Sequence, residues 1–163
     1  NIDADETAGE LHDRLMITGA RLVVETVTAI AEGTCNVVDQ PATTKGIKPA
    51  PRIFREHCKI DWTKTAPEVH NLIRGLSPYP GAYSRLISGE HITVVKILRS
   101  SIIGQGERLL PGEVTIADRN RLLVSCSDSV IEILQLQAAG KKEMMASDFL
   151  RGIKSGTLIF EQK

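Results

Sequence analysis

The sequence has few cysteines, no long apolar run and no secretion signal. Cys35, Cys58 and Cys126 are widely spaced and show no CxxC or Cys/His ligand spacing, so neither a disulfide framework nor a zinc site is indicated. No apolar run approaches the roughly 20 residues that a membrane span needs. The first residues have neither the basic nor the apolar region of a signal peptide. We therefore expect a cytoplasmic protein without a membrane or metal partner.

Aromatic residues are also scarce, at 4% of 163 residues. Proteins that hold single-stranded nucleic acid commonly stack bases on aromatic side chains, and this chain offers little material for such a platform. If it binds RNA, we expect recognition of phosphates and shape rather than of stacked bases. We expect Trp62 to be packed on apolar surface, and Tyr79 and Tyr83 to fix a turn between prolines and glycine.

The formal net charge is zero, but the charge is unevenly distributed. Residues 1–33 contain seven acidic and two basic residues, a net charge of −5, which leaves +5 for residues 34–163. Such asymmetry can indicate an anionic partner for the basic part. Solvated surface charge without a partner is the alternative.

A long helix is predicted near the amino terminus. Thr7 and Glu10 form a capping-box pattern, and Gly33 is placed as a helix-ending glycine. Between them, apolar residues recur at helical spacing: Leu11, Leu15, Leu22, Val23, Val27 and Ile30. An amphipathic helix of this length needs a partner for its apolar stripe. We expect it to dock on the rest of the chain, to associate with a second copy, to pack on something outside this chain, or to fray.

Residues 34–64 are predicted to form an extended linker, because three prolines and a glycine interrupt any helical pattern. The segment carries a basic excess of three charges. An extended basic segment can follow a phosphate backbone; a solvated connector is the alternative.

A second helix and a small barrel are predicted after the linker. Thr65 and Glu68 form another capping box, with Pro67 in the first turn of a short helix that extends to Leu76. Runs rich in Val, Ile and Leu at 82–87, 91–99, 112–117, 121–126 and 130–137 are separated by turn signals and predict five strands. Ser147 is predicted to cap a final helix over 148–154, which would cover the open side of the barrel.

The predicted fold class is therefore mainly β with flanking helices. It consists of a small OB-like five-stranded barrel preceded by a long amphipathic helix and an extended linker. OB folds commonly bind oligonucleotides, but SH3-like and split barrels would show the same pattern, and fold class does not establish function.

Three stretches together resemble the family of methionyl-tRNA formyltransferases. DETAGELHDRL at residues 5–15 resembles the D-x-T-x-G-x-L-x-D-x-L segment near the end of the family's catalytic domain. IDW at 60–62 and IRGLSPYPGAY at 73–83 are similar to the signature that joins the family's linker to its C-terminal barrel. GKKEMMASDFLRG at 140–152 is similar to the family's closing motif. In order and spacing these stretches cover nearly the whole chain.

The resemblance implies a parent enzyme that transfers a formyl group from 10-formyltetrahydrofolate to methionyl initiator tRNA in translation initiation. The family's Asn, His and Asp for this chemistry belong to an amino-terminal Rossmann-like domain, and their sequence context is absent here. We therefore expect residues 1–33 to be the terminal helix of that truncated domain, 34–64 a basic linker and 65–163 the OB-like C-terminal barrel domain. We expect this fragment to bind no cofactor and to be inactive alone.

The resemblance also implies a tRNA-binding surface on the linker and barrel. Our candidate tRNA contacts are basic residues of both parts: Lys45, Lys48, Arg52, Arg55, Lys59, Arg74, Lys141, Lys142 and Arg151. Alternatively, Lys141 and Lys142 form a solvated turn after Gly140. For Arg74 the alternative is an ion pair that holds its helix to the barrel.

Two other classes fit part of this sequence. The segment 78–82 also resembles sugar-nucleotide formyltransferases and formyltetrahydrofolate hydrolase-type enzymes, whose substrate is not tRNA. A stand-alone RNA-binding barrel module is the other alternative. The closing motif favours the tRNA enzyme.

Overall fold

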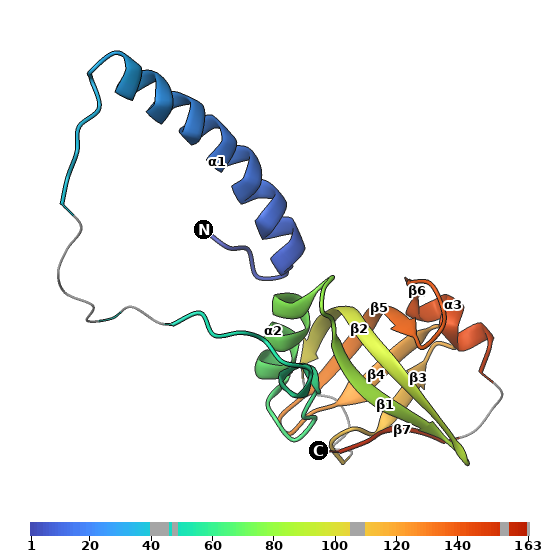
Figure 1. Ribbon diagram of the computed structural model, residues 1–163. Coiled ribbons are helices and arrows are strands. Elements are labelled where there is room, and N and C mark those ends of the chain that lie inside the picture. Colours follow the sequence, from blue (N-terminus) through green and yellow to red (C-terminus); the bar gives the residue numbers. More distant parts are fainter. Residues whose placement is uncertain (40–45, 47–48, 105–109, 154–156, 163) are drawn as a thin grey trace.

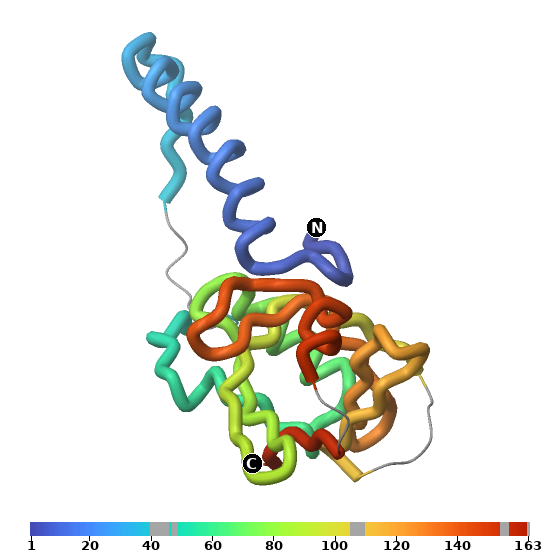
Figure 2. Tube along the Cα trace, turned by 90° about the vertical axis from the view of Figure 1, so that its right-hand side faces the viewer, coloured from blue at the N-terminus to red at the C-terminus, as the bar shows by residue number. Residues whose placement is uncertain are grey.

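The computed structural model describes residues 1–39, 46, 49–104, 110–153 and 157–162, and it shows a mainly β structure with few helices (Figure 1). A barrel-like sheet forms the body of the molecule. One long helix projects away from it in both views (Figures 1 and 2).

The projecting helix is α1 (Ala8–Ala31), and its start is the predicted capping box. Thr7 Oγ1 accepts from the Glu10 backbone N–H at 3.2 Å, while the Thr7 N–H donates to Glu10 Oε2 at 2.9 Å. None of the residues of α1 is buried. Of the apolar residues that we expected to pack, Leu11 is half-buried, and the others are exposed to solvent: Leu15, Leu22, Val23, Val27 and Ile30.

The chain returns to the barrel through a short 3-10 helix, η1 (Arg55–Cys58), and then enters α2 (Ala66–Leu76). The second predicted capping box, Thr65 with Glu68, is confirmed, with Pro67 in the first turn. The backbone N–H of Ala66 also donates to Asp128 Oδ1 at 2.7 Å, which ties the start of α2 to the turn before β5. The inner face of α2 buries Val69, Ile73 and Leu76 against the sheet.

The sheet contains seven strands within the described residues, where five were predicted. They are β1 (Ala82–Ser88), β2 (His91–Gly104), β3 (Val114–Ala117), β4 (Arg121–Ser125), β5 (Val130–Ala138), β6 (Met144–Met145) and β7 (Leu158–Phe160). The five expected strands are present as β1–β5. The two additional strands have two and three residues, too short to show the alternation from which strands are predicted.

The strand order is β3-β4-β5-β2-β1-β7, all antiparallel, with β6 beside β5. The two outer strands come together, because the Phe160 N–H donates to the Gly112 carbonyl oxygen at 2.8 Å and Glu113 forms a bridge with Ile159. The sheet therefore curls into a nearly closed barrel, which is visible as a ring of chain in Figure 2.

The core of the barrel includes residues that we expected in the linker. Ile60 and Trp62 are fully buried. The Trp62 ring stacks on Phe160 with 5.0 Å between ring centroids, and its Nε1–H donates to Ser84 Oγ at 3.0 Å. The expectation that Trp62 packs on apolar surface is confirmed.

The last helix, α3 (Ala146–Arg151), packs on β4, β5 and β6 with Leu150 buried. The prediction that Ser147 caps it was wrong: α3 begins two residues earlier than predicted, and Met145 occupies the cap position without a side-chain hydrogen bond. Ala146 is buried at the first helical position. Contact with the barrel rather than a polar cap therefore determines where α3 starts.

No helix in the described ranges is both long enough and apolar enough to cross a membrane.

Candidate nucleic-acid interface

The structure brings several basic residues to one outer face of the barrel. In the sheet register, Tyr83 of β1 lies opposite Lys96 of β2, and Lys96 lies opposite Gln137 of β5. All three side chains are half-buried, whereas their chain neighbours Ala82, Ser84, Val95, Ile97, Leu136 and Ala138 are buried. Directly paired residues share a face of a sheet, so the three form a row across the outside of the barrel.

Two predicted candidates extend this row at its ends. At the β1 end, the Arg55 guanidinium carbon lies 5.7 Å from the centroid of the Tyr83 ring, in cation–π contact. At the β5 end, the Gln137 side-chain amide donates to the Lys141 backbone carbonyl at 3.0 Å. We call Arg55, Tyr83, Lys96, Gln137 and Lys141 the basic row.

The basic row joins the linker side and the barrel side of the predicted surface. Arg52 lies next to it, with its guanidinium carbon 5.5 Å from the centroid of the Phe54 ring. Lys142 follows Lys141 in the exposed turn after Gly140. Lys96, which sequence reasoning missed, is the central cation of the row. Its partner Tyr83 lies across the tight turn that joins β1 to β2, but Gln137 belongs to a strand far away in the sequence, so the whole row could not be read from a local motif.

Other candidates are engaged with acidic groups. Lys59 Nζ lies 2.9 Å from Glu161 Oε2, and Arg85 also contacts this carboxylate at 3.2 Å. The hydrogen bond from Lys59 is the main cause that lowers the pKa of Glu161. Arg151 pairs with Asp148 at 3.0 Å on the exposed side of α3. Each of these cations has an acidic partner that partly offsets its attraction for phosphate.

Arg74 holds the amino-terminal segment. Its Nε donates to Asn71 Oδ1 at 2.7 Å, and its Nη1 donates to the backbone carbonyl oxygens of Glu6 at 3.2 Å and Asp3 at 3.4 Å. Most of its hydrogen-bonding capacity therefore serves structure. Lys45 and Lys48, the remaining candidates, lie outside the described residues.

A groove opens beside the basic row, between residues 53–58 and the turn at 79–81. Its volume is about 380 Å³, and Phe54, Arg55, Tyr79, Tyr83 and Lys96 contribute to its lining. Both cations of the lining belong to the basic row. The face thus offers positive charge and aromatic surface together.

The titratable groups elsewhere do not form a catalytic arrangement within the part of the chain that the structure describes. Burial raises the pKa of the Cys126 thiol to about 12 and raises that of Cys58, so both thiols remain protonated and unreactive at neutral pH. The His70 ring is buried, with Nδ1 3.0 Å from Ser100 Oγ and Nε2 3.3 Å from Asp5 Oδ1. Among the described residues, no group of three His, Cys, Asp or Glu could hold a metal ion.

Residues 52–154 match the family model described as formyl transferase, C-terminal domain. A methionyl-tRNA formyltransferase from Chelativorans sp. (strain BNC1) is 42% identical over 156 residues, which are 95% of this chain and 48% of the relative. One from Bacteroides fragilis (strain YCH46) is 42% identical over 145 residues, 87% of this chain and 45% of the relative. The chain thus spans about half the length of the curated relatives it matches.

Solved structures of HypX from Aquifex aeolicus share the fold. A structure of a multiply substituted HypX variant gives a TM-score of 0.65 at 18% identity, covering 94% of this chain and 28% of the HypX chain. A HypX structure in complex with tetrahydrofolic acid gives a TM-score of 0.55 at 18% identity, covering 85% of this chain and 26% of the HypX chain. At this level of identity the likeness concerns the fold alone.

Proposed function

This chain belongs to the formyltransferase family through its C-terminal domain, and we propose that it is the tRNA-binding, carboxy-terminal part of a methionyl-tRNA formyltransferase. The whole protein would transfer a formyl group from 10-formyltetrahydrofolate to the amino group of methionyl initiator tRNA in translation initiation, in the cytoplasm. The names of relatives that are 42% identical over most of this chain support the assignment.

The basic row is the observation that carries the tRNA-binding role. In it, Arg55 and Lys96 lie on one face, and the backbone of Lys141 borders that face at the β5 end, although the three residues come from separate parts of the sequence. Cations that neutralise backbone phosphates supply most of the sequence-independent affinity for nucleic acid. Arg52 and Lys142 lie beside the row and extend the proposed contact surface.

The finer architecture is part of the same proposal. We infer that the barrel is OB-like, with the five longer strands as its framework and β6 and β7 as additions. Residues 1–33 would be the last helix of a formyltransferase catalytic domain, 34–64 a linker and 65–163 the barrel domain. The exposed apolar side chains of α1 fit a helix that packs on another part of the whole protein or on a second copy.

The contact between His70 and Asp5 does not fit a catalytic role in formyl transfer. His70 and Asp5 are in contact, but the His70 ring is buried against Ser100 and faces the backbone of the amino-terminal segment. A general base must reach the amine of a bound substrate, and this imidazole is covered. We therefore assign no step of formyl transfer to these residues.

Salt-dependent tRNA binding tests the proposal. Initiator tRNA carrying a fluorophore is titrated with the chain at several salt concentrations, and anisotropy gives the affinity. Lys96→Met and Lys141→Met should each weaken binding and reduce the slope of log affinity against log salt by about one. Lys64→Met is the matched control, because Lys64 is exposed and lies by Ser127 at the other end of β5; it should leave the slope unchanged. Absence of tRNA binding at low salt would refute the assignment.

A further inference from the structure

The groove beside the basic row exposes aromatic rings in a chain that has few of them. The Tyr79 side chain is 85% exposed and Phe54 is 48% exposed, and both line the groove. We expected Tyr79 to fix the turn into β1. The turn is instead held by the backbone, because the Gly81 N–H donates to the Leu76 carbonyl oxygen at 2.9 Å. The Tyr79 ring is therefore free to contact a ligand.

The same groove is positively charged. Arg55 and Lys96 line it, and none of the described acidic residues contributes to its lining. Both cations are held in place: Arg55 lies over the Tyr83 ring, and the aliphatic stem of Lys96 passes close to Gly81. A Cβ added at Gly81 would lie 3.1 Å from Lys96 Cδ, so glycine at this turn leaves room for the lysine stem.

Together, these features match the chemistry of a nucleotide. A nucleobase presents flat faces that stack on aromatic rings, and stacking is tolerant of base identity because every base has such a face. The phosphate attached to it needs a cation within a few ångströms. The groove provides both kinds of surface side by side, and its volume of about 380 Å³ is in the range of sites for small ligands.

We propose that this groove holds one unpaired nucleotide of the bound RNA. Its base stacks on Tyr79 or Phe54, and the adjoining phosphate contacts Lys96 and Arg55. The proposal rests on the tRNA-binding function. The low aromatic content led us to expect recognition of phosphates and shape only, and the groove adds a stacking contact to that surface. A protein that reads unpaired positions of an RNA commonly splays the base out and stacks it in this way.

Substitution of Tyr79 gives a sharp test, because the ring is exposed and its loss should not affect folding; a thermal melt of each variant checks this. Tyr79→Ala should weaken tRNA binding by about 5- to 150-fold, the range that one stacked base supplies. Tyr79→Phe keeps the ring and should bind as the wild-type protein does. Neither variant changes the charge, so the slope of log affinity against log salt should stay the same, in contrast to Lys96→Met.

Two further RNAs separate this proposal from the proposed function. A short unstructured oligoribonucleotide should bind in a way that Tyr79→Ala weakens, whereas binding of a fully paired RNA duplex should be insensitive to that substitution. If tRNA binds but Tyr79→Ala and Phe54→Ala both leave its affinity unchanged, the groove is not a nucleotide site and the tRNA-binding function stands. If the oligoribonucleotide shows the Tyr79 dependence while tRNA does not bind, the groove stands and the function fails.

Discussion

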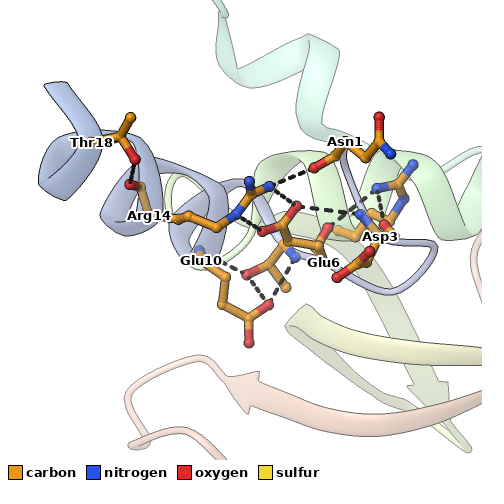
Figure 3. A network of polar contacts seen from close by, with 8 residues as sticks. Asn1, Asp3, Glu6, Glu10, Arg14 and Thr18 are labelled. Carbon is orange, nitrogen blue, oxygen red and sulfur yellow. Dashed lines mark hydrogen bonds and ion pairs between the residues drawn. The ribbon is translucent and has the colours of Figure 1, made fainter. Parts of the chain in front are cut away.

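Arg99 of β2 forms an ion pair with Glu10 in the first turn of α1, across 89 residues of sequence. It is one of a small set of polar contacts that dock the start of α1 on the barrel. Arg74 donates to the Glu6 carbonyl, and the Gly9 N–H donates to the Ser77 carbonyl at 3.0 Å. Figure 3 shows the amino-terminal side of this network, in which Arg14 also binds Glu6. Polar contacts at one end of α1, rather than a buried apolar face, hold the helix on the barrel.

The Glu10 carboxylate should titrate far below its ordinary pKa of 4.5, at about 2. The hydrogen bond from the Thr7 backbone N–H contributes most, followed by the bond from Arg99 and then the bond from the Thr7 hydroxyl. Arg99→Gln should therefore raise the pKa of Glu10 part of the way, since the Thr7 bonds remain. An NMR titration of the Glu10 side-chain carbon in both proteins measures this. An unchanged pKa in the variant would show that the Arg99 contact is absent in solution.

The lowered pKa of Glu10 also determines how the docking of α1 on the barrel depends on pH. Because the folded-state pKa of Glu10 is lowered, its contribution is complete above the ordinary value of 4.5 and is lost as the pH falls from there towards about 2. Contact between α1 and the barrel should accordingly weaken in acid before the barrel itself unfolds.

Arg74→Ala should loosen the amino-terminal segment without unfolding the barrel. The variant loses the hydrogen bonds to the Asp3 and Glu6 carbonyls, and bonds from a charged donor are worth roughly 1.5–3 kcal/mol in such settings. Limited proteolysis should cut residues 1–33 several-fold faster, and the melting temperature of the barrel should change little. Arg21→Ala, an exposed arginine within α1, is the control and should leave the cleavage rate unaltered.

Local sequence signals predicted those parts of the fold that are encoded locally. Thr7 with Glu10 and Thr65 with Glu68 marked the starts of α1 and α2, because a capping box needs only residues three positions apart. Runs rich in Val, Ile and Leu between turn signals similarly indicated β1 to β5. β6 and β7 were not predicted, because a strand of two or three residues shows no periodicity and its pairing is set by the barrel.

The candidate site was predictable only in part. Arg55 and Lys141 were named as basic residues of a tRNA-binding surface, but their connection through Lys96 depends on strand register. The tight turn between β1 and β2 fixes the register of Tyr83 with Lys96. The pairing of β2 with β5 joins strands far apart in sequence and contains register shifts, which the local sequence does not reveal. The exposed position of Tyr79 was missed for a related reason: prolines and glycine predict a turn, but they do not show which side chain the turn directs into solvent.

Ser84→Ala should destabilise the barrel although the side chain is small. The Ser84 hydroxyl is the acceptor for the buried Trp62 indole N–H at 3.0 Å, and a buried donor left without a partner costs roughly 1–3 kcal/mol. Urea unfolding gives the loss in the free energy of unfolding. Ser88 lies on the same strand but is half-buried, so Ser88→Ala should lower the free energy of unfolding by less. Equal losses for the two variants would mean that the Trp62 bond adds nothing to stability.

Gly112 should be the glycine at which alanine most disturbs closure of the barrel. Its φ is +87°, and an added Cβ would lie 2.6 Å from the Phe160 carbonyl oxygen, on the strand whose N–H binds the Gly112 carbonyl. Gly140→Ala is the matched control, because φ there is +72° and no atom of the described residues lies within 4 Å of the added one. Both variants bear the cost of positive φ, roughly 1–2 kcal/mol, but only Gly112→Ala must also push β7 away.

Urea unfolding measures how much free energy of unfolding each variant loses. The difference between the two losses isolates the contact between Gly112 and β7, which closes the barrel. Gly112→Ala should in addition speed hydrogen exchange of the Phe160 amide, since the 2.8 Å bond to Gly112 must lengthen to relieve the clash. Gly140→Ala should leave that amide as protected as in the wild-type protein. If both variants lose the same stability and the Phe160 amide is equally protected in both, the barrel does not close through Gly112 in solution.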